Sequence, residues 1–252
     1  MPRILITGCS SGFGQAIAAR FLDQGWEVIA TMRRPSAKGL PASDRLRVLP
    51  LDVTDPESIT SAIAKAGQIN ALVNNAGVGM LNVLEGAEIT KARDLFEINV
   101  LGAMAMTRAV MPAMRERQTG VIVNISSSVT LRPLPALSIY TASKAALNAF
   151  TESFALEAAE FGVRARLVLP GRAKATSFGK NAVARMGMDI PEAYGLFVQA
   201  YFQSLQSVTE KTEVSDVAQA VWRAVTDEAA PMKLPAGTDA ETWFREEGIP
   251  VE

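Results

Sequence analysis

The chain has 252 residues, 48% of them hydrophobic, and a formal net charge of −1 from 25 Lys and Arg against 26 Asp and Glu. This balance excludes the strongly basic surface that attracts nucleic acids and anionic membranes, so we expect neither as a partner. The chain has no histidine, the commonest acid–base side chain, and its one cysteine, Cys9, excludes an internal disulfide.

The first predicted element is a buried strand near the N-terminus. The apolar run Arg3–Thr7 ends at a Thr-Gly turn, so it is too short for a secretory or membrane segment. Together with the single cysteine, this favours a cytoplasmic protein. Further apolar runs predict strands at Trp26–Thr31, Leu46–Val53, Ile69–Asn75, Gly120–Ser127 and Val163–Pro170.

Helical patterns separate these strands. They cover residues 12–24, a segment that begins at Thr54 or Asp55, the stretch Thr90–Arg117, and a run from Tyr140 to about Phe161. Pro112 predicts a kink in the third of these helices. Apolar strands that alternate with helices predict a parallel sheet flanked by helices on both faces. Because the chain shows no repeat, linker or low-complexity tract, we interpret residues 1–252 as a single doubly wound α/β domain.

The stretch TGCSSGFG, residues 7–14, lies where a phosphate-binding turn belongs, after the first strand and before the first helix. Gly8 permits a tight turn, Gly12 lets the backbone approach a pyrophosphate, and Gly14 lets the helix pack on the strand. The N-terminus of the helix offers N–H groups to the same anion. A loop for a nucleoside triphosphate is disfavoured because no Gly-Lys-Ser/Thr occurs here. The context therefore favours a dinucleotide, although such a turn could also only join two elements.

Three further motifs follow later strands. NNAG, residues 74–77, ends the fourth strand, and NISSS, residues 124–128, ends the fifth, where the carboxyl ends of parallel strands bind ligands. Tyr140 lies thirteen residues beyond Ser127, and Lys144 follows it by one helical turn on the same face. Taken singly, NNAG could be a polar turn, and the Tyr-Lys pair could serve only packing.

Tyrosine and lysine can together take the place of histidine in proton transfer. A tyrosine hydroxyl has an unperturbed pKa of about 10, too high to cycle easily near neutrality. A cation about 4 Å away, at an effective dielectric constant near 20, contributes on the order of 4 kcal/mol. We therefore expect Lys144 to lower the pKa of Tyr140. Hydride transfer to a ketone needs such a proton donor at the developing alkoxide.

In their order and spacing, the motifs between about residues 3 and 171 resemble the short-chain dehydrogenase/reductase family. The matching pieces are TGCSSGFG, the LDV at Leu51–Val53, NNAG, the Asn of FEINVLGAM, the Ser ahead of YTASK, and Pro170–Gly171. The ordered set is far more specific than any one motif. The resemblance implies a Rossmann-type fold, and TGCSSGFG with ATMRRP looks most like the NADP-linked hydroxysteroid, retinol and carbonyl reductase branches.

The resemblance also implies a role for each matching residue. Ser127 would bind the substrate oxygen, Tyr140 would be the acid and base, and Lys144, supported by Asn99, would also hold the nicotinamide ribose. No metal site is expected. Besides Tyr140 and Lys144, the implied cofactor-binding residues are Gly8, Ser10, Ser11, Gly12, Phe13, Gly14, Arg33, Asp52, Val53, Asn75, Ala76, Gly77, Pro170, Gly171 and Thr176.

The loop after Pro170–Gly171 departs from the family pattern. Family members usually carry Thr five residues after the Pro, in contact with the nicotinamide carboxamide, but this chain has Ala175 there and Thr176 next to it. The residue three after the Pro, usually Val, is Ala173. Either Thr176 substitutes after a local shift, or the contact is lost.

The end of the second strand predicts which dinucleotide binds. An NAD-specific site has an acid there for the ribose 2′-hydroxyl. Here Met32 takes that place, and Arg33 and Arg34 follow. A guanidinium can hold a 2′-phosphate with charge-assisted hydrogen bonds, and Ser10 could add a hydroxyl. We therefore expect NADP(H) as cofactor, with Arg33 in contact and Arg34 as a solvated loop charge.

Residues 173–208 correspond to the segment that covers the substrate in the family. Their aromatic and methionine side chains favour an apolar pocket for a carbonyl or alcohol substrate, although half of them could instead pack on the core. These side chains are Phe178, Met186, Met188, Tyr194, Phe197, Tyr201 and Phe202. The family resemblance further implies a homodimer or homotetramer, packed through the helices near Thr90–Arg117 and Tyr140–Phe161.

The expected function is therefore that of an NADP(H)-dependent alcohol dehydrogenase or carbonyl reductase. One alternative is a regulatory or scaffold protein on the same fold that binds NADP(H) without turnover, but such a protein does not need Ser127, Tyr140 and Lys144 together. A second alternative is an epimerase or dehydratase. Those enzymes usually act on nucleotide-sugars and have a longer C-terminal substrate region.

Overall fold

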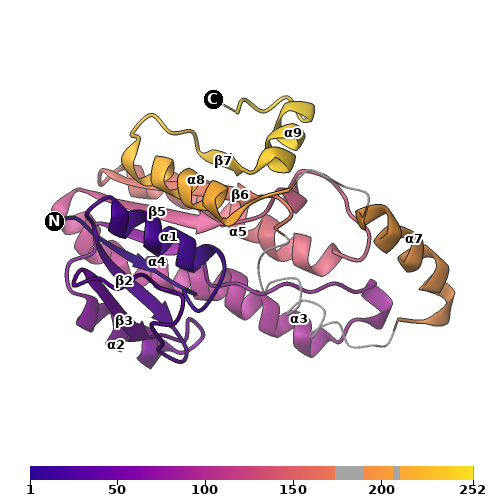
Figure 1. Cartoon of the computed structure of the whole chain (residues 1–252), viewed down its shortest axis with the longest axis horizontal. Helices are drawn as coiled ribbons and strands as arrows, with labels where there is room; N and C mark the ends of the chain where they lie inside the picture. The colour runs from indigo at the N-terminus through magenta and orange to yellow at the C-terminus, as the bar shows by residue number, and fades with distance from the viewer. Residues whose placement is uncertain (174–189, 207–210, 252) are drawn as a thin grey trace.

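A seven-stranded parallel sheet forms the centre of the computed structural model, which describes residues 1–173, 190–206 and 211–251 (Figure 1). The strand order is β3-β2-β1-β4-β5-β6-β7. Because the order reverses between β1 and β4, the sheet is doubly wound, and the predicted fold class is confirmed. The strands are β1 (Arg3–Ile6), β2 (Glu27–Met32), β3 (Leu46–Pro50), β4 (Ala71–Asn74), β5 (Gly120–Ile125), β6 (Val163–Pro170) and β7 (Lys233–Ala236).

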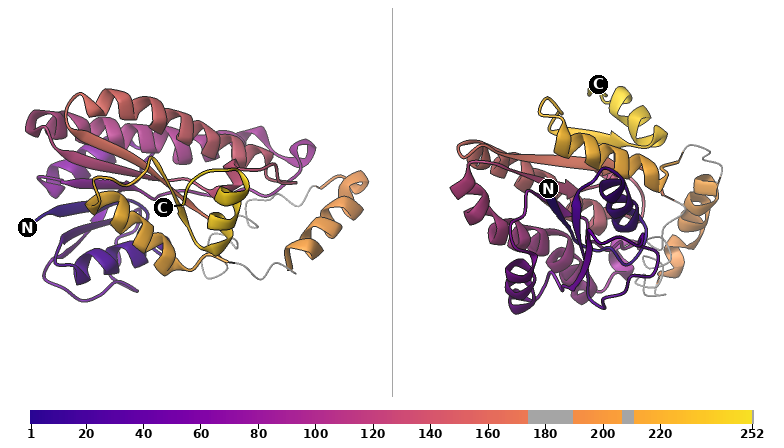
Figure 2. Two further views of the ribbon diagram at one scale, coloured as in Figure 1. Left: turned by 90° about the horizontal axis from the view of Figure 1, so that it is seen from above. Right: turned by 60° about the vertical axis from the view of Figure 1, so that its left-hand side comes forward.

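Helices cover both faces of this sheet (Figure 1, Figure 2). One face holds α1 (Phe13–Asp23) and α8 (Val214–Thr226), and the other holds α2 (Pro56–Ala66), α4 (Gly102–Arg117) and α5 (Ser138–Ala159). The other α-helices in the described parts of the chain are α3 (Ile89–Phe96), α7 (Gly195–Gln206) and α9 (Thr238–Glu246). Among these, α7 lies at the end of the molecule toward which the strands point. No helix in the described parts of the chain is long and apolar enough to cross a bilayer.

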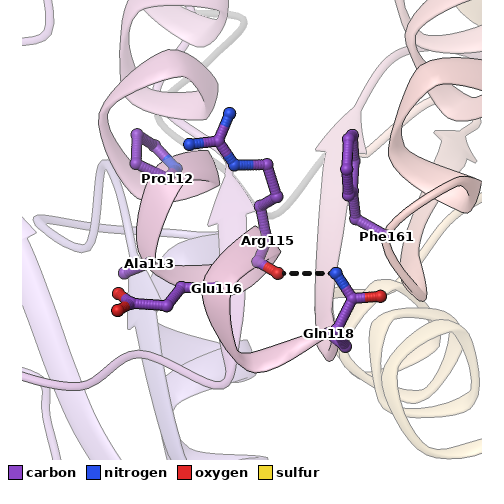
Figure 3. A pocket seen from close by; sticks show the side chains of 6 residues that line it. All are labelled: Pro112, Ala113, Arg115, Glu116, Gln118 and Phe161. Atoms are coloured by element: carbon purple, nitrogen blue, oxygen red, sulfur yellow. Dashed lines mark hydrogen bonds between the residues drawn. The ribbon is translucent and has the colours of Figure 1, made fainter.

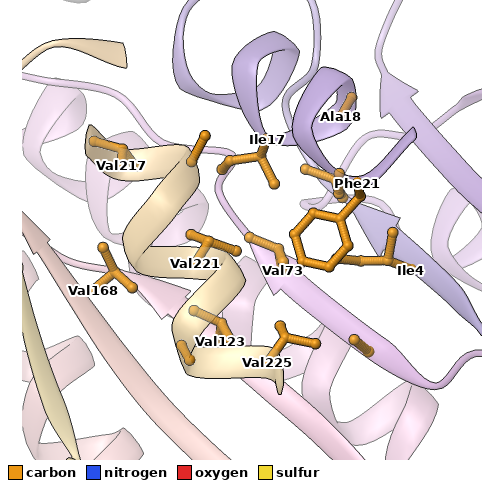
Figure 4. Packing of buried hydrophobic residues seen from close by; sticks show 14 of the residues in the cluster. Ile4, Ile17, Ala18, Phe21, Val73, Val123, Val168, Val217, Val221 and Val225 are labelled. Atoms are coloured by element: carbon orange, nitrogen blue, oxygen red, sulfur yellow. The ribbon is translucent and has the colours of Figure 1, made fainter. Parts of the chain in front are cut away.

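Alternate residues of the central strands β1, β4 and β5 pack into two separate apolar cores, because successive side chains point to opposite faces of a sheet. Leu5, Leu72 and Ile122 face α2, α4 and α5. Their neighbours along the same strands face α1 and α8 instead. Figure 4 shows this second core, which contains Ile4, Val73, Val123, Val168, Ile17, Ala18, Phe21, Val217, Val221 and Val225. Because the strands are packed on both faces, their ends have fixed positions. The loops that follow these ends carry the residues of the candidate site.

Two strand predictions were wrong. β3 ends at Pro50 rather than Val53, and it is an edge strand whose side chains are half-buried or exposed, not buried on both faces. β7 was not predicted, because its sequence KLPA is short and has a lysine and a proline. Proline is tolerated at the edge of a sheet, where its missing N–H costs no ladder bond. β4 and β5 also end before Asn75 and Ser127, which leaves both residues in the loops at the strand ends.

The predicted helix Thr90–Arg117 is interrupted, but not at Pro112. α3 ends at Phe96, a π-helical turn covers Glu97–Leu101, and α4 then runs through Pro112 to Arg117. A π-helical turn widens the helix by one residue and is frequent at functional sites. Asn99 lies in this turn.

Candidate active site

The Gly-rich turn between β1 and α1 is too tightly packed for side chains at two of its glycines. Gly8 has φ 75°, and a Cβ there would lie 2.8 Å from Ala76 Cα. A Cβ on Gly14 would lie 2.5 Å from the carbonyl oxygen of Gly8. Gly12 caps α1 with φ 60°, and the helix has neither a side-chain cap nor an acid in its first turn. The first N–H groups of α1 are thereby left to bind an anion.

Cys9, inside this turn, is a packing residue. It is fully buried, its backbone N–H donates to Thr31 O at 2.9 Å, and its thiol donates to Ile6 O at 3.3 Å. Burial raises the pKa of the Cys9 thiol to about 12. The thiol therefore stays protonated near neutral pH, where it is a poor nucleophile.

The NNAG loop after β4 is hydrogen-bonded to the Gly-rich turn. Asn75 Nδ2 donates to the carbonyl oxygens of Thr7 at 2.8 Å and Gly8 at 3.1 Å. In return, Thr7 Oγ1 accepts the backbone N–H groups of Asn75 at 3.0 Å and Ala76 at 2.9 Å. Sequence reasoning missed Thr7, although a Thr between a buried strand and a glycine turn was a signal for such a link. The predicted residues Gly8, Asn75 and Ala76 are thus brought together.

Ser127 and Tyr140 meet at the carboxyl end of β5. Ser127 follows the strand, Tyr140 lies in the first turn of α5, and their side chains share a hydrogen bond. Both are buried, with 8% and 6% of their surfaces exposed. Burial raises the pKa of Tyr140 above its ordinary value, and the hydrogen bond with Ser127 opposes this rise. The prediction that Lys144 lowers this pKa is not met by the chain alone, because removal of the phenolate from water dominates.

Lys144 lies one helical turn beyond Tyr140 and is equally buried. Its Nζ donates to Ile125 O at 2.8 Å and lies 6.0 Å from the centroid of the Tyr140 ring. Burial lowers the pKa of Lys144 to about 8. A Cβ on Gly77 would lie 3.3 Å from Asn99 Oδ1 and 3.6 Å from Lys144 Nζ. Gly77 therefore lies close to both the amide of Asn99 and the ammonium of Lys144, and a side chain there would meet both groups.

Asn99 is fixed by hydrogen bonds on both sides of its amide. Its Oδ1 accepts Val78 N at 2.8 Å, and its Nδ2 donates to Val78 O at 2.9 Å and Ser143 Oγ at 3.2 Å. Ser143 Oγ itself donates to Tyr140 O at 2.8 Å. The π-helical turn is thus tied to the helix that bears Tyr140 and Lys144. Ser143 was missed from the sequence, although it is the Ser of YTASK directly before the lysine.

The predicted adenine end of the site lies at the tips of β2 and β3. Asp52 Oδ1 accepts Thr54 N at 3.0 Å and Thr54 Oγ1 at 2.8 Å. These two bonds, with a smaller contribution from the charge of Arg33, lower the pKa of Asp52. Arg33 is exposed, whereas Met32 is buried in the core under α1. Val53 packs against Gly102, where a Cβ would lie 2.7 Å from Val53 Cγ2.

The segment that follows Pro170–Gly171 is described only in part. Thr176, Phe178, Met186 and Met188 lie outside the described residues, as does the side chain of Phe202. In the described portion, Leu196 and Phe197 of α7 are exposed while Val198 is buried. Tyr194 shares a hydrogen bond with Glu85, which raises the pKa of Tyr194. The expectation of an apolar pocket built from this segment stays a prediction.

An open hollow of about 770 Å³ lies at the opposite edge of the sheet (Figure 3). Its walls are the C-terminal ends of α4 and α5, where the guanidinium of Arg115 lies 5.9 Å from the ring of Phe161. None of the described site residues lines it. The ligand-binding edge of a doubly wound sheet is the carboxyl edge, so we do not place the site in this hollow.

A doubly wound α/β sheet with a glycine cradle at its switch point is the architecture of a dinucleotide-binding protein. A family model described as short chain dehydrogenase matches residues 2–186, and the chain belongs to that family. It is 32% identical to human retinol dehydrogenase 8 over 251 residues, which are 92% of this chain and 80% of that protein.

Solved structures agree with this assignment. A short-chain dehydrogenase from Streptomyces avermitilis is 35% identical, with a TM-score of 0.82 over 97% of this chain and 91% of that one. A short chain dehydrogenase from Burkholderia cenocepacia, solved in complex with NADP, is 27% identical, with a TM-score of 0.78 over 98% of this chain and 92% of that one.

Proposed function

We propose that this oxidoreductase uses NADP(H) to interconvert a ketone or aldehyde with the corresponding alcohol. The observation that carries the proposal is the hydrogen bond between Ser127 and Tyr140, with Lys144 one turn away and Asn99 across Gly77. These groups lie at the carboxyl ends of β4 and β5, next to the Gly-rich turn. A sensor without catalysis has no need of a buried proton donor paired with a buried ammonium, so the arrangement favours turnover.

The residues present fit a dinucleotide. The uncapped N-terminus of α1, with the glycine cradle before it, suits a pyrophosphate. Asp52 and Val53 would hold the adenine end, Arg33 the 2′-phosphate, and Lys144 the nicotinamide ribose. When bound, the nicotinamide supplies or accepts the hydride.

Proton transfer falls to Tyr140. Because burial raises its pKa, the hydroxyl is protonated near neutral pH and is ready to act as an acid toward a carbonyl oxygen that gains negative charge. Ser127 donates a hydrogen bond to that same oxygen. Once the proton has left, the ammonium of Lys144, whose Nζ lies 6.0 Å from the ring centroid, stabilises the phenolate by charge attraction.

An apolar carbonyl compound is the substrate class that we propose. The aromatic and methionine residues of the segment 173–208 support it, as does the relative named retinol dehydrogenase 8. The test is a panel of apolar ketones and aldehydes with NADPH absorbance as the readout. Consumption of NADPH with at least one of them is expected. NADPH binding by fluorescence, with no turnover across the panel, would favour the regulatory alternative.

Replacing Arg33 with Ala is expected to weaken NADPH binding about ten- to a hundredfold, because one charge-assisted hydrogen bond contributes about 1.5–3 kcal/mol. Binding of NADH, which lacks the 2′-phosphate, should change little. Arg34→Ala is the matched control, since Arg34 is the neighbouring exposed arginine. Fluorescence titrations at two salt concentrations measure the effect, and the preference for NADPH should fall at high salt. Equal or better catalytic efficiency with NADH in the unmodified protein would contradict the assignment.

We expect the chain to assemble as a homodimer or homotetramer through α4 and α5. Leu156 of α5 is 76% exposed and Leu101 is 47% exposed, and the rings of Phe150 and Phe154 stack at 5.7 Å. Burial of such apolar groups favours association. Light scattering at micromolar concentration should show the oligomer, and Leu156→Arg should weaken it. Leu84→Arg, at another exposed leucine, should not. A monomeric unmodified protein would refute the prediction.

A further inference from the structure

One buried carboxylate holds both ends of the segment that the chain inserts between β6 and α8. Asp239 lies in the first turn of α9 and is 6% exposed. Its Oδ2 accepts the backbone N–H of Arg172, which follows Gly171 directly. Its Oδ1 accepts the hydroxyl of Thr212 at 2.8 Å, two residues before α8 begins at Val214.

Backbone hydrogen bonds close the same junction. Thr212 N donates to Arg172 O at 3.1 Å, so the segment leaves and returns at adjacent positions. Gly171 N donates to Ala236 O at 3.1 Å, and Thr212 Oγ1 also lies 2.9 Å from Ala236 O. A Cβ on Gly171 would overlap the carboxylate of Asp239. The glycine of the Pro-Gly motif is therefore required by Asp239, independently of any cofactor.

The junction is connected to the candidate active site on two sides. Ser126 N donates to Val168 O at 2.8 Å, which joins the end of β5, directly before Ser127, to the end of β6. On the other side, the charge of Arg172 acts on Tyr201 of α7, where burial raises and Arg172 lowers the pKa of that hydroxyl. Residues 171–172 therefore follow closely on the β6 contact with Ser126, and the charge of Arg172 acts on α7.

The helix that carries Asp239, α9, also contacts the loop after Ser127. The guanidinium of Arg132 lies 4.5 Å from the centroid of the Trp243 ring and forms an ion pair with Glu246. Phe244 packs beneath, against Leu167 and Leu169 of β6. α9 thus fixes the residues that follow β5 and those that follow β6 with one rigid element.

We propose that Asp239 is a positioning residue for the reaction. It sets the place of Pro170–Gly171 and of Thr212, and through them the nicotinamide end of the site. This inference rests on the proposed function, because it assigns Asp239 to the same site. Asp239 touches neither the reacting atoms nor Tyr140 in the described contacts, so its effect passes through the backbone of residues 171–172 and 212.

The test compares Asp239→Ala and Asp239→Asn with the unmodified protein. Hydrogen exchange of the cofactor-free protein, followed by mass spectrometry, should show faster exchange in peptides that contain Arg172 and Thr212. The affinity for NADPH should fall about tenfold or more, which corresponds to about 1.4 kcal/mol of binding free energy lost when residues 171–172 are no longer held in place. Asp239→Asn keeps the shape, but its amide NH2 group replaces one of the two carboxylate oxygens and faces either Arg172 N or the pair Thr212 Oγ1 and Ala240 N. It should therefore show the same changes to a smaller degree. If Asp239→Ala does not fold, the hydrogen exchange and NADPH affinity of Asp239→Asn decide the test.

Asp227→Ala is the matched control. Asp227 accepts Ala229 N at 2.9 Å in the exposed turn after α8 and pairs with Arg223. Its loss removes a carboxylate and a backbone hydrogen bond but leaves residues 171–172 untouched. This variant should keep normal exchange at Arg172 and normal NADPH affinity. If the Asp239 variants exchange faster at residue 172 but bind NADPH and turn over as the unmodified protein does, Asp239 has only a structural role and the proposal is overturned. The unmodified protein's own NADPH binding and turnover decide the proposed function separately.

Discussion

Replacing Tyr140 with Phe is expected to lower turnover by about 10²–10⁴-fold, the usual contribution of a positioned general acid. NADPH affinity should stay nearly unchanged. The substitution removes one oxygen and leaves the ring, which packs in a small apolar cluster with Met80 and Leu95. Single-turnover rates with an active carbonyl substrate give the chemical step, and a fluorescence titration gives the affinity.

Tyr194→Phe is the control for this experiment. Tyr194 also has a hydrogen-bonded hydroxyl, but its partner is Glu85 rather than Ser127. Its loss should change turnover far less than the loss of the Tyr140 hydroxyl. A Tyr140→Phe enzyme that reduces the substrate at a near-normal rate would show that another group, or water, supplies the proton.

Replacing Lys144 with Met is expected to damage both turnover and NADPH affinity, in contrast to Tyr140→Phe. The ammonium has two proposed roles, since it stabilises the phenolate of Tyr140 and holds the nicotinamide ribose. Met fills a similar volume, so the loss is chiefly that of the charge and of the bond to Ile125 O. Measured together, kcat and the NADPH dissociation constant separate the roles. If turnover is lost while the NADPH affinity stays unchanged, Lys144 does not hold the nicotinamide ribose.

The same variant has a signature in stability that needs no cofactor. Burial lowers the pKa of Lys144 in the folded chain to about 8, below its ordinary 10.5. Below pH 8 Lys144 is protonated in both the folded and the unfolded chain, and its buried charge destabilises the folded chain. Between pH 8 and 10.5 the unfolded chain binds more protons. The free energy of unfolding should therefore rise with pH, by up to about 1.4 kcal/mol per pH unit relative to Lys144→Met.

Urea denaturation of both proteins between pH 7 and 10 measures this difference. Cys9 and Tyr140 have raised pKa values, so their contributions to stability fall as pH rises above their ordinary values near 9 and 10. Cys9 is present in both proteins, so its contribution cancels in the comparison. Tyr140 lies beside Lys144, so the two proteins are compared below pH 10, where the Tyr140 hydroxyl keeps its proton in the folded and the unfolded chain. A difference that does not vary with pH would mean that Lys144 titrates in the folded chain as it does in water.

Much of the site followed from strand ends, since side chains after parallel strands gather at one edge of the sheet. That argument placed Asn75 and Ser127 at one edge of the sheet, the family resemblance added Pro170–Gly171, and the i, i+4 spacing placed Lys144 on the same helix face as Tyr140. The direction of the Tyr140 pKa shift could not be predicted, because a sequence shows the neighbouring cation but not the depth of burial that outweighs it. The π-helical turn at Asn99 could not be predicted either, because the sequence EINVL is compatible with an ordinary α-helix.

The residues after β6 were the least predictable part. β7 has too few apolar residues to be recognised, and Asp239 resembles any acid in the first turn of a helix. Its importance arises from contacts with residues 171, 172 and 212, and such long-range pairing leaves no local pattern in the chain.

The late position of α9 has a consequence for how the protein is made. Synthesis runs from the N-terminus, so every residue of the family motifs, up to Gly171, is made before Asp239 exists. About 70 residues separate Gly171 from Asp239, which takes roughly 3–14 s at the usual 5–20 residues per second. During that interval Arg172 N–H lacks the acceptor that holds it in the finished chain. A nascent chain that stalls in this interval, or one cut before Thr238, contains the complete motif set. It cannot form the hydrogen bond between Arg172 N and Asp239 that holds the turn after β6.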